Sequence, residues 1–220
     1  MTVPEKVVIW GAGGQALVVA DAITASGLME VWCFVDDINH DRAGSQIAGF
    51  PIMGAGGLDR VMAEDIRYLI VAMGNNRART RCAERAVRKG FELTTVVHPS
   101  AVVASWVEVG KGSYVGAGAI ISPGARIGKN VIINTKANVA HHCIVEDGAH
   151  ICPGVTMGGW VKVGERAWVG LGSTVRDHVT VGSDSLIGVG ASVVKDVEEQ
   201  VVAYGVPARR VRDARDNDGF

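Results

Sequence analysis

The chain has 220 residues, of which 48% are hydrophobic and 20% are charged, so it can bury one large core or two smaller ones. Its formal net charge of −1 excludes the strongly basic field that attracts nucleic acid or an anionic membrane surface. No apolar run is long enough to span a bilayer, and the N-terminal residues lead into a strand-like segment without the anatomy of a signal peptide. We therefore predict a cytoplasmic protein whose four cysteines, none with CxxC spacing, are buried free thiols.

The first 98 residues alternate between strand-like and helix-like segments. Strands are predicted at residues 6–10, 31–35, 67–73 and 93–97, and helices are predicted at 15–25 and from the Gly74-Asn75-Asn76 turn to about Lys89. This order favours an α/β domain with a small parallel sheet and right-handed crossovers. Ligands of such sheets bind beyond the carboxyl ends of the strands. Three turns fall there, and they contain Gly11, Gly13 and Gly14, Asp36 and Asp37, and Gly74 and Asn75.

The second half follows a six-residue period. From Val103 to Val193 every sixth residue is Val or Ile, except Met157, and a small or β-branched residue comes four positions after each. This period fits neither a helix nor an alternating hairpin and is typical of a hexapeptide β-helix, in which three hexapeptides make one coil. We predict a β-helix over residues 99–200 and a C-terminal tail over 201–220. The flat outer faces of such a prism favour a trimer.

The two halves together resemble a known family. The features that carry the resemblance are Gly11-Ala-Gly-Gly14, His98-Pro-Ser-Ala101, the hexapeptide repeats with Asn134-Thr135 and His141 in register, and Gly205-Val-Pro-Ala-Arg209. They are similar to the nucleotide-sugar acetyltransferases with a left-handed β-helix, which include bacillosamine-pathway and GDP-perosamine N-acetyltransferases and sialic acid O-acetyltransferases. The resemblance implies that the small domain binds a nucleotide-sugar, that the β-helix and a neighbouring subunit of a homotrimer bind acetyl-CoA, and that no metal is needed.

The resemblance also implies roles for particular residues. His141 matches the general base, and His150 and Gly159 match residues beside the thioester, with Leu171 farther along the acetyl-CoA groove. The nucleotide-sugar is expected at Gly11, Gly13, Gly14, Asp36, Asp37, Gly74 and Asn75. Two positions depart from the family pattern: Gln15 replaces a histidine after the glycine turn, and His142 replaces the carboxylate that orients the base.

Coil geometry tests these roles independently, because residues separated by one coil in the sequence stack about 4.8 Å apart along the β-helix. Gly159 follows His141 by one full coil, so it is expected to leave room for a thioester and to present its amide to the carbonyl oxygen. His141 and His142 lie at a predicted turn and are expected to diverge, and His150 is expected to reach the surface.

The predicted activity is transfer of an acetyl group from acetyl-CoA to the amino group of a UDP- or GDP-linked 4-amino-4,6-dideoxysugar, a reaction of O-antigen or surface polysaccharide synthesis. The alternative is O-acetylation of sialic acid or another sugar. Three histidines could also hold zinc, as in a β-helix carbonic anhydrase, but their close spacing from His141 to His142 and on to His150 fits that site poorly. A non-enzymatic sugar-nucleotide sensor is the remaining possibility, and it would not bind acetyl-CoA.

Overall fold

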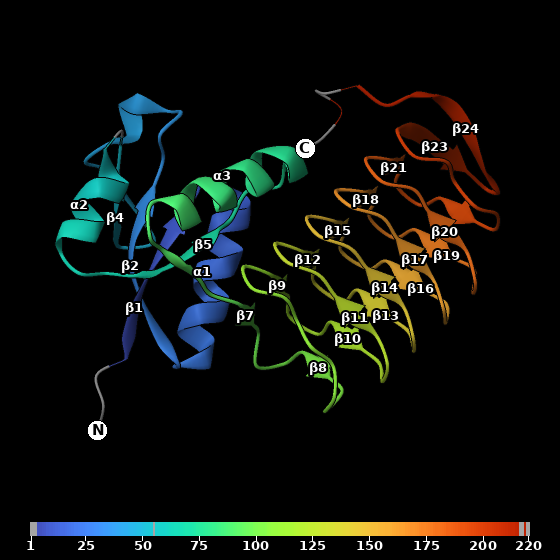
Figure 1. Ribbon diagram of the computed structural model, residues 1–220, viewed down its shortest axis with the longest axis horizontal. Helices are drawn as coiled ribbons and strands as arrows, with labels where there is room; N and C mark the ends of the chain where they lie inside the picture. Colours follow the sequence, from blue (N-terminus) through green and yellow to red (C-terminus); the bar gives the residue numbers. More distant parts are fainter. Residues whose placement is uncertain (1–3, 55, 216–217, 219–220) are drawn as a thin grey trace.

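The computed structural model describes residues 4–54, 56–215 and 218, which form a small α/β domain followed by a parallel β-helix (Figure 1). Helices α1 and α3 of the small domain lie on the side that faces the β-helix. The two predicted architectures are therefore both present. Within the described ranges, no helix is long and apolar enough to cross a bilayer.

The small domain is built on a six-stranded sheet in the order β3-β4-β2-β1-β5-β6. Its strands are β1 (Glu5–Trp10), β2 (Met29–Val35), β3 (Gln46–Ile47), β4 (Phe50–Met53), β5 (Tyr68–Val71) and β6 (Glu92–Leu93). Its helices are α1 (Gly14–Ser26), α2 (Gly57–Ala63) and α3 (Asn76–Arg88), with a 3₁₀ turn η1 at His40–Arg42. All strand pairs are parallel except β3 with β4. The sequence did not predict η1, α2 or the β3–β4 hairpin.

The strand predicted at residues 93–97 is divided between two sheets. Leu93 ends β6 of the small domain, whereas Val96 and Val97 form β7, which pairs with β9 of the β-helix. The β-helix therefore starts before the predicted boundary at residue 98. Thr94 and Thr95 connect the two sheets.

The β-helix consists of two-residue strands joined by tight turns. They are β8 (Val102–Val103), β9 (Tyr114–Val115), β10 (Ile120–Ile121), β11 (Arg126–Ile127), β12 (Ile132–Ile133), β13 (Asn138–Val139), β14 (Ile144–Val145), β15 (His150–Ile151), β16 (Thr156–Met157), β17 (Lys162–Val163), β18 (Trp168–Val169), β19 (Thr174–Val175), β20 (Thr180–Val181), β21 (Leu186–Ile187) and β22 (Ser192–Val193). Each strand pairs in parallel with the strand that lies three hexapeptides along the chain, as Ile133 does with Ile151. The predicted coil length is confirmed.

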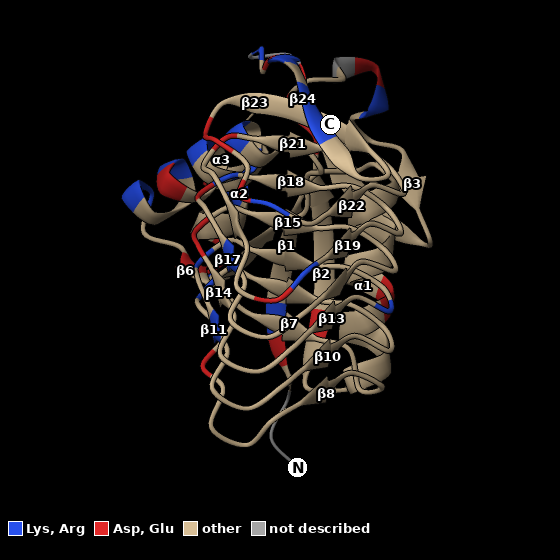
Figure 2. Cartoon of the chain, turned by 90° about the vertical axis from the view of Figure 1, so that its right-hand side faces the viewer, with Lys and Arg blue, Asp and Glu red and all other residues tan. Residues whose placement is uncertain are grey.

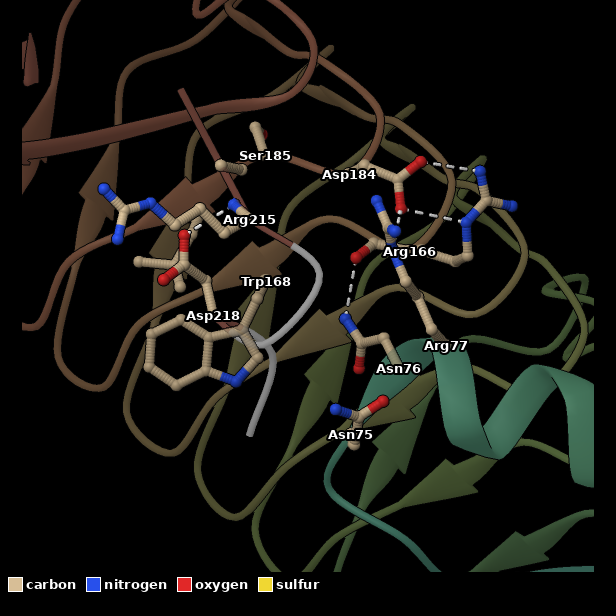
Figure 3. Close-up of a pocket in the computed structure, with 11 residues that line it drawn as sticks. Asn75, Asn76, Arg77, Arg166, Trp168, Asp184, Ser185, Arg215 and Asp218 are labelled. Atoms are coloured by element: carbon tan, nitrogen blue, oxygen red, sulfur yellow. Dashed lines mark hydrogen bonds and ion pairs between the residues drawn. The ribbon is translucent and has the colours of Figure 1, made fainter. Parts of the chain in front are cut away.

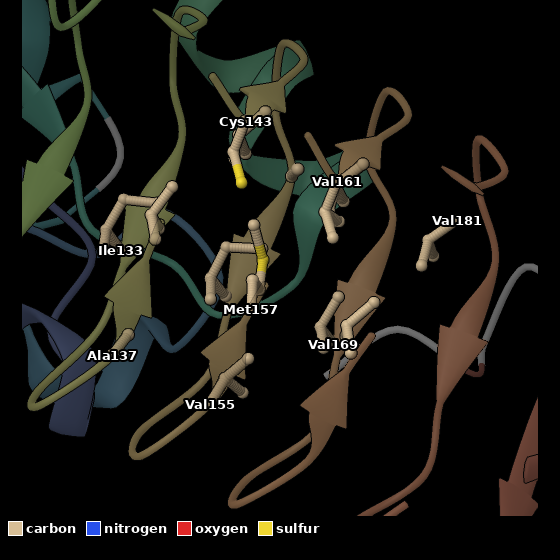
Figure 4. Packing of buried hydrophobic residues seen from close by; sticks show 14 of the residues in the cluster. Ile133, Ala137, Cys143, Val155, Met157, Val161, Val169 and Val181 are labelled. Atoms are coloured by element: carbon tan, nitrogen blue, oxygen red, sulfur yellow. The ribbon is translucent and has the colours of Figure 1, made fainter. Parts of the chain in front are cut away.

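The interior of the β-helix is a continuous stack of aliphatic side chains. Every register residue from Val115 to Val193 is buried, including Met157, the one exception to the Val or Ile pattern. Cys143 and Cys152 contribute to the same core as small buried thiols. Figure 4 shows Ile133, Met157, Val169 and Val181 in successive coils. Each coil therefore buries its apolar edge only against its neighbours.

Residues 201–220 are not a tail in the part that the structure describes. Strands β23 (Val201–Gly205) and β24 (Ala208–Asp213) form an antiparallel hairpin, and β23 continues the β-helix sheet by pairing with β21. Val201, Val202 and Ala203 are buried. The prediction of a separate tail was wrong, because these apolar residues cap the open end of the last coil.

A buried arginine joins the small domain to the β-helix. Arg79 of α3 is 1% exposed and donates to the carbonyl oxygens of Met73 (2.9 Å), Asn130 (2.9 Å) and Gly148 (2.7 Å). Burial lowers its pKa to about 9. The neighbouring Asn76 donates to the carbonyl oxygen of Arg166 at 2.8 Å. The bonds to Asn130, Gly148 and Arg166 cross from one domain to the other, so they fix how the small domain sits on the coils.

We predict that Arg79→Met lowers the free energy of unfolding by about 3 kcal/mol, because several buried carbonyl oxygens lose their cationic donor. The measurement is the urea denaturation midpoint. The matched control is Arg88→Met on the same helix, whose exposed pair with Glu84 at 3.9 Å contributes about 0.5 kcal/mol or less. Equal losses in the two variants would show that Arg79 has no special structural role.

Candidate functional site

His141 lies at the corner between β13 and β14, and its imidazole rests on the backbone of Gly159 in the next coil. A Cβ atom at Gly159 would lie 2.5 Å from Cε1 and 2.7 Å from Nε2 of His141. The predicted stacking is therefore present. The expectation that Gly159 leaves empty room for a thioester was wrong in one respect, because the space above its Cα atom is filled by the histidine ring.

The amide of Gly159 differs from its neighbours in its hydrogen bonding. At this corner the backbone N–H that donates to the previous coil belongs to the residue after Gly159. Trp160 N–H donates to the carbonyl oxygen of His141 at 3.0 Å, and in the next coil His178 N–H donates to that of Gly159 at 2.9 Å. Among the described residues, no hydrogen bond uses the Gly159 N–H itself. This amide is free to donate to an oxyanion next to the His141 ring.

His141 and His142 contact each other instead of diverging. Their Nδ1 atoms are 3.1 Å apart, and the ring planes meet at 83°. Two nitrogens at this distance form one hydrogen bond, so the pair holds a single proton between them. When His141 donates this proton, its Nε2 atom is unprotonated and can act as a base.

His150 lies elsewhere, at the junction of the two domains. It is 6% exposed, its Nε2 accepts a hydrogen bond from Asn134 Nδ2 at 3.1 Å, and its ring meets Trp168 edge-on at 6.3 Å. Burial, and then the charge of Arg79, lower its pKa to about 3, while a backbone contact with Gly74 acts in the opposite direction. The expected surface position of His150 was wrong, because the small domain covers this row of the β-helix.

The burial of His150 predicts a pH dependence of stability. The unfolded chain binds a proton near the ordinary value of 6.5, whereas the folded chain does so only near 3. Between these values the unfolded state holds more protons, so the free energy of unfolding falls as pH falls, by up to about 1.4 kcal/mol per pH unit. We expect His150→Gln to flatten this slope in denaturation curves at pH 7, 6 and 5. The control is the exposed His178→Gln, and an unchanged slope in His150→Gln would contradict the prediction.

Leu171 is at another corner of the prism. It lies in the turn between β18 and β19 and is 44% exposed, beside Val189 of the next coil. His141 and Gly159 occupy the corner between the β13 and β14 sheets, at the opposite edge of the sheet that contains β13, β16 and β19. One chain therefore does not bring Leu171 and Gly159 to a common groove.

The glycine turn has two distinct parts. Gly11 has φ 127°, and a Cβ atom there would lie 2.6 Å from the carbonyl oxygen of Ala72, so this glycine is needed for packing. Gly13 and Gly14 have no atom within 4 Å of an added Cβ and border open space at the start of α1. Arg42, which the sequence did not single out, donates to the carbonyl oxygen of Ala12 at 2.7 Å and brings a positive charge to the turn.

The two aspartates after β2 have structural partners. Asp36 is 7% exposed and accepts hydrogen bonds from the backbone of Ile38 (3.2 Å) and Asn39 (3.0 Å). Burial acts to raise its pKa, but the bonds from Asn39 and Ile38 hold it below the ordinary value. Asp37 accepts from Trp10 Nε1 at 3.0 Å and pairs with Arg85 at 3.1 Å. These contacts favour the structural alternative, and nucleotide-sugar binding by either aspartate stays a prediction.

Gly74 and Asn75 lead into α3 at the domain junction. Asn75 accepts a hydrogen bond from the backbone of Ala78 at 2.8 Å and so caps the helix. A cavity beside it, shown in Figure 3, is lined by Asn76, Arg166, Asp184 and other polar residues, but its volume of about 30 Å³ suits one water molecule and not a nucleotide. Among the described residues, no group of three His, Cys, Asp or Glu side chains is arranged to hold a metal ion.

Known proteins share this architecture. Residues 6–86 match the family described as the PglD N-terminal domain. The chain is 29% identical over 184 residues to GDP-perosamine N-acetyltransferase of Escherichia coli O157:H7, with 81% of each chain covered. It is also 31% identical over 137 residues to the carnitine operon protein CaiE of Escherichia coli K12, covering 57% of this chain and 68% of that protein.

Solved structures match more of the chain. A histidine-to-asparagine variant of perosamine N-acetyltransferase from Caulobacter crescentus, in complex with CoA and GDP-perosamine, is 38% identical with a TM-score of 0.89, covering 94% of this chain and 97% of that one. The acetyltransferase domain of PglB from Neisseria gonorrhoeae, in complex with acetyl coenzyme A, is 34% identical with a TM-score of 0.88, covering 95% and 100%. The matches cover nearly the whole chain and therefore both domains, and so the chain belongs to the nucleotide-sugar acetyltransferases of the hexapeptide-repeat superfamily.

Proposed function

We propose that this enzyme transfers an acetyl group from acetyl-CoA to the C4 amino group of a GDP-linked 4-amino-4,6-dideoxysugar of the perosamine type, with His141 as the general base. The observation that carries the proposal is the His141 ring, which is paired through Nδ1 with His142 and packs against Gly159 of the next coil. Both supporting relatives are named as perosamine N-acetyltransferases, and one of them holds CoA and GDP-perosamine in its structure.

The reaction needs three tasks at this corner. His141 Nε2 removes a proton from the sugar ammonium group, and the free amine attacks the thioester carbonyl carbon. The Gly159 N–H donates to the oxyanion that forms. The C–S bond then breaks while the C–N bond remains, and the thiolate takes the proton from His141. The new amide nitrogen loses its excess proton to water, so the overall step releases one proton. Direct attack needs no covalent acyl-enzyme, and acetyl-CoA is a cosubstrate.

We propose that the enzyme is a homotrimer whose sites lie between subunits. The sheet that contains β8, β10, β13, β16, β19 and β22 carries no charged residue on its strands, and Figure 2 shows these strands in tan. The neighbouring sheet carries Arg126 on β11 and Lys162 on β17. Its outer row includes the exposed Val102 and Ile120. Leu171 and His141 of one chain lie at opposite edges of this sheet. An acetyl-CoA that contacts both would therefore bind between two subunits, with His141 from one subunit and Leu171 from the other. A cytoplasmic location and a role in O-antigen or surface polysaccharide synthesis complete the proposal.

The nucleotide-sugar is proposed to bind where α1 begins. Backbone amides at a helix start attract a diphosphate, and Gly13 and Gly14 leave room for it. Arg42 adds a cation at the same turn, with a side chain that is 38% exposed. Gly74 and Asn75 are proposed to line the same edge of the sheet, since they follow β5 next to β1.

We expect His141→Asn to remain a trimer in light scattering and to lose about 10²-fold or more in kcat, because the typical contribution of a general base is removed. The assay measures release of the CoA thiol with a panel of GDP-, UDP- and dTDP-linked amino sugars and sialic acid. The control is His98→Asn, which lies outside the corner. Near-wild-type kcat in His141→Asn would remove this residue from the role, and activity only with sialic acid would favour O-acetylation.

We expect Gly159→Ala to lower kcat by about 10²-fold, because the new Cβ atom must displace the His141 ring that lies 2.5 Å from it. KM for the nucleotide-sugar should change little, since the small domain is untouched. Steady-state kinetics with both substrates varied measures the two effects separately. A variant with unchanged kcat and raised KM for acetyl-CoA would show that Gly159 bounds the acetyl pocket only.

A further inference from the structure

Beside the His141 corner, three aromatic side chains are stacked along the coils, a set that we call the corner ladder: His142, Trp160 and His178. Each follows the previous one by a full coil, and all three have positive φ values, of 58°, 61° and 60°. The rings of His142 and Trp160 are 4.2 Å apart and parallel to within 7°. The rings of Trp160 and His178 are 6.2 Å apart at 5°. The coil repeat therefore holds Trp160 face to face with the partner of the candidate base.

His142 occupies a slot between two coils. On one side is Trp160, and on the other is Gly124, where a Cβ atom would lie 2.9 Å from Cδ2 of His142. These two neighbours fix the plane of the His142 ring. The Nδ1 atom of His142 lies 3.1 Å from Nδ1 of His141, so the Nδ1 edge of the His142 ring faces the candidate base. The ring is therefore positioned from three directions.

The His141–His142 pair lacks an anionic partner. Within the described ranges, neither ring is hydrogen-bonded or ion-paired to a carboxylate, whereas His178 lies 3.9 Å from Asp177. When His141 takes a proton at Nε2, the pair becomes cationic, and the shared Nδ1 proton allows this charge to spread to His142. In a catalytic triad a carboxylate stabilises the corresponding charge.

We propose that Trp160 is a positioning residue that takes the place of this carboxylate. The negative π face of its indole lies against His142, at a distance where it attracts a cation, so it stabilises the positive charge of the protonated pair and holds the His142 ring in its plane. This inference rests on the proposed role of His141 as base.

The ladder does not suit a second use as a platform for a substrate ring. Trp160 is 52% exposed, but one face of its indole is stacked on His142 with the ring centroids 4.2 Å apart, and the other is flanked by the parallel ring of His178 at 6.2 Å, so neither face is wholly free. A sugar or a base would need a free face to stack on. The contact with His142 is therefore the interaction through which Trp160 acts.

The first experiment compares Trp160→Leu with Trp160→Phe. Both replacements are unbranched at Cβ and can occupy the same turn, but only Phe keeps a π face. We expect kcat of Trp160→Leu to fall about tenfold with KM for both substrates unchanged, and Trp160→Phe to stay within about threefold of wild type. His178→Leu, which removes the ring on the other face of the indole, should leave kcat near wild type. Equal kcat for the Leu and Phe variants would overturn the proposal.

The second experiment restores the carboxylate. In a His142→Asp background, the pair has its anion again, so Trp160→Leu should change kcat by no more than about twofold. A structural role for Trp160 would give the same fall in both backgrounds. A tenfold fall in the His142→Asp background would therefore overturn the proposal.

A third readout needs no substrate. Nitrogen-15 shifts of the His141 and His142 rings show where the positive charge lies when the pair carries one extra proton. We expect the charge to be shared by both rings in wild type and confined to His141 in Trp160→Leu. If no nucleotide-sugar is acetylated but this difference is found, the proposed function fails and the role of Trp160 stands. Identical shifts in the two proteins would overturn the role of Trp160 whatever the substrate.

Discussion

The length of one coil, three hexapeptides, is the constraint on which the rest of the structure depends. It stacks Val and Ile in the interior, and it equally places turn residues of successive coils against one another. His141 meets Gly159, and His142 meets Trp160, because the members of each pair are separated by one coil. The spacing that stabilises the core is thus the spacing that assembles the candidate site. A one-residue slip of one coil would separate these pairs as well as expose the apolar register.

The repeat is also why so much of this half could be predicted from the sequence. A local pattern sets the geometry, so the register from Val103 to Val193 predicts the coil length and the partner of His141 before any contact is known. The side chains at the corner were harder to predict. The sequence places His141 and His142 on a turn, but their contact through Nδ1 depends on ring orientation, and the slot for His142 depends on Trp160. Counting one coil onward from His142 would have pointed to Trp160.

The predictions that failed in and beside the small domain failed for a different reason. The period of the β-helix predicts that the His150 side chain points away from the core of the coils, and it does. The side chain is nevertheless buried, because the small domain covers this face of the β-helix. Arg79 is also buried by the contact between the two domains. Its position on a helix does not indicate that its side chain will bind carbonyl oxygens of the coils. Asp36 follows a strand, where a ligand contact is a fair prediction, yet its carboxylate caps its own loop. Burial between two domains is a tertiary effect that neither periodicity nor motif spacing contains.

His142 adjoins the candidate base as a second imidazole, so the proposed site has to stabilise a positive charge without a carboxylate. A carboxylate beside the base supplies negative charge directly, whereas a second imidazole supplies only a hydrogen-bond acceptor. The coil repeat brings in a further neighbour, because the residue one coil later is held face to face with His142. Trp160 can therefore stabilise a cation at His142 from the next coil. In a β-helix the neighbours of a turn side chain are thus found one coil away as well as next to it in the chain, as Trp160 and His141 are for His142.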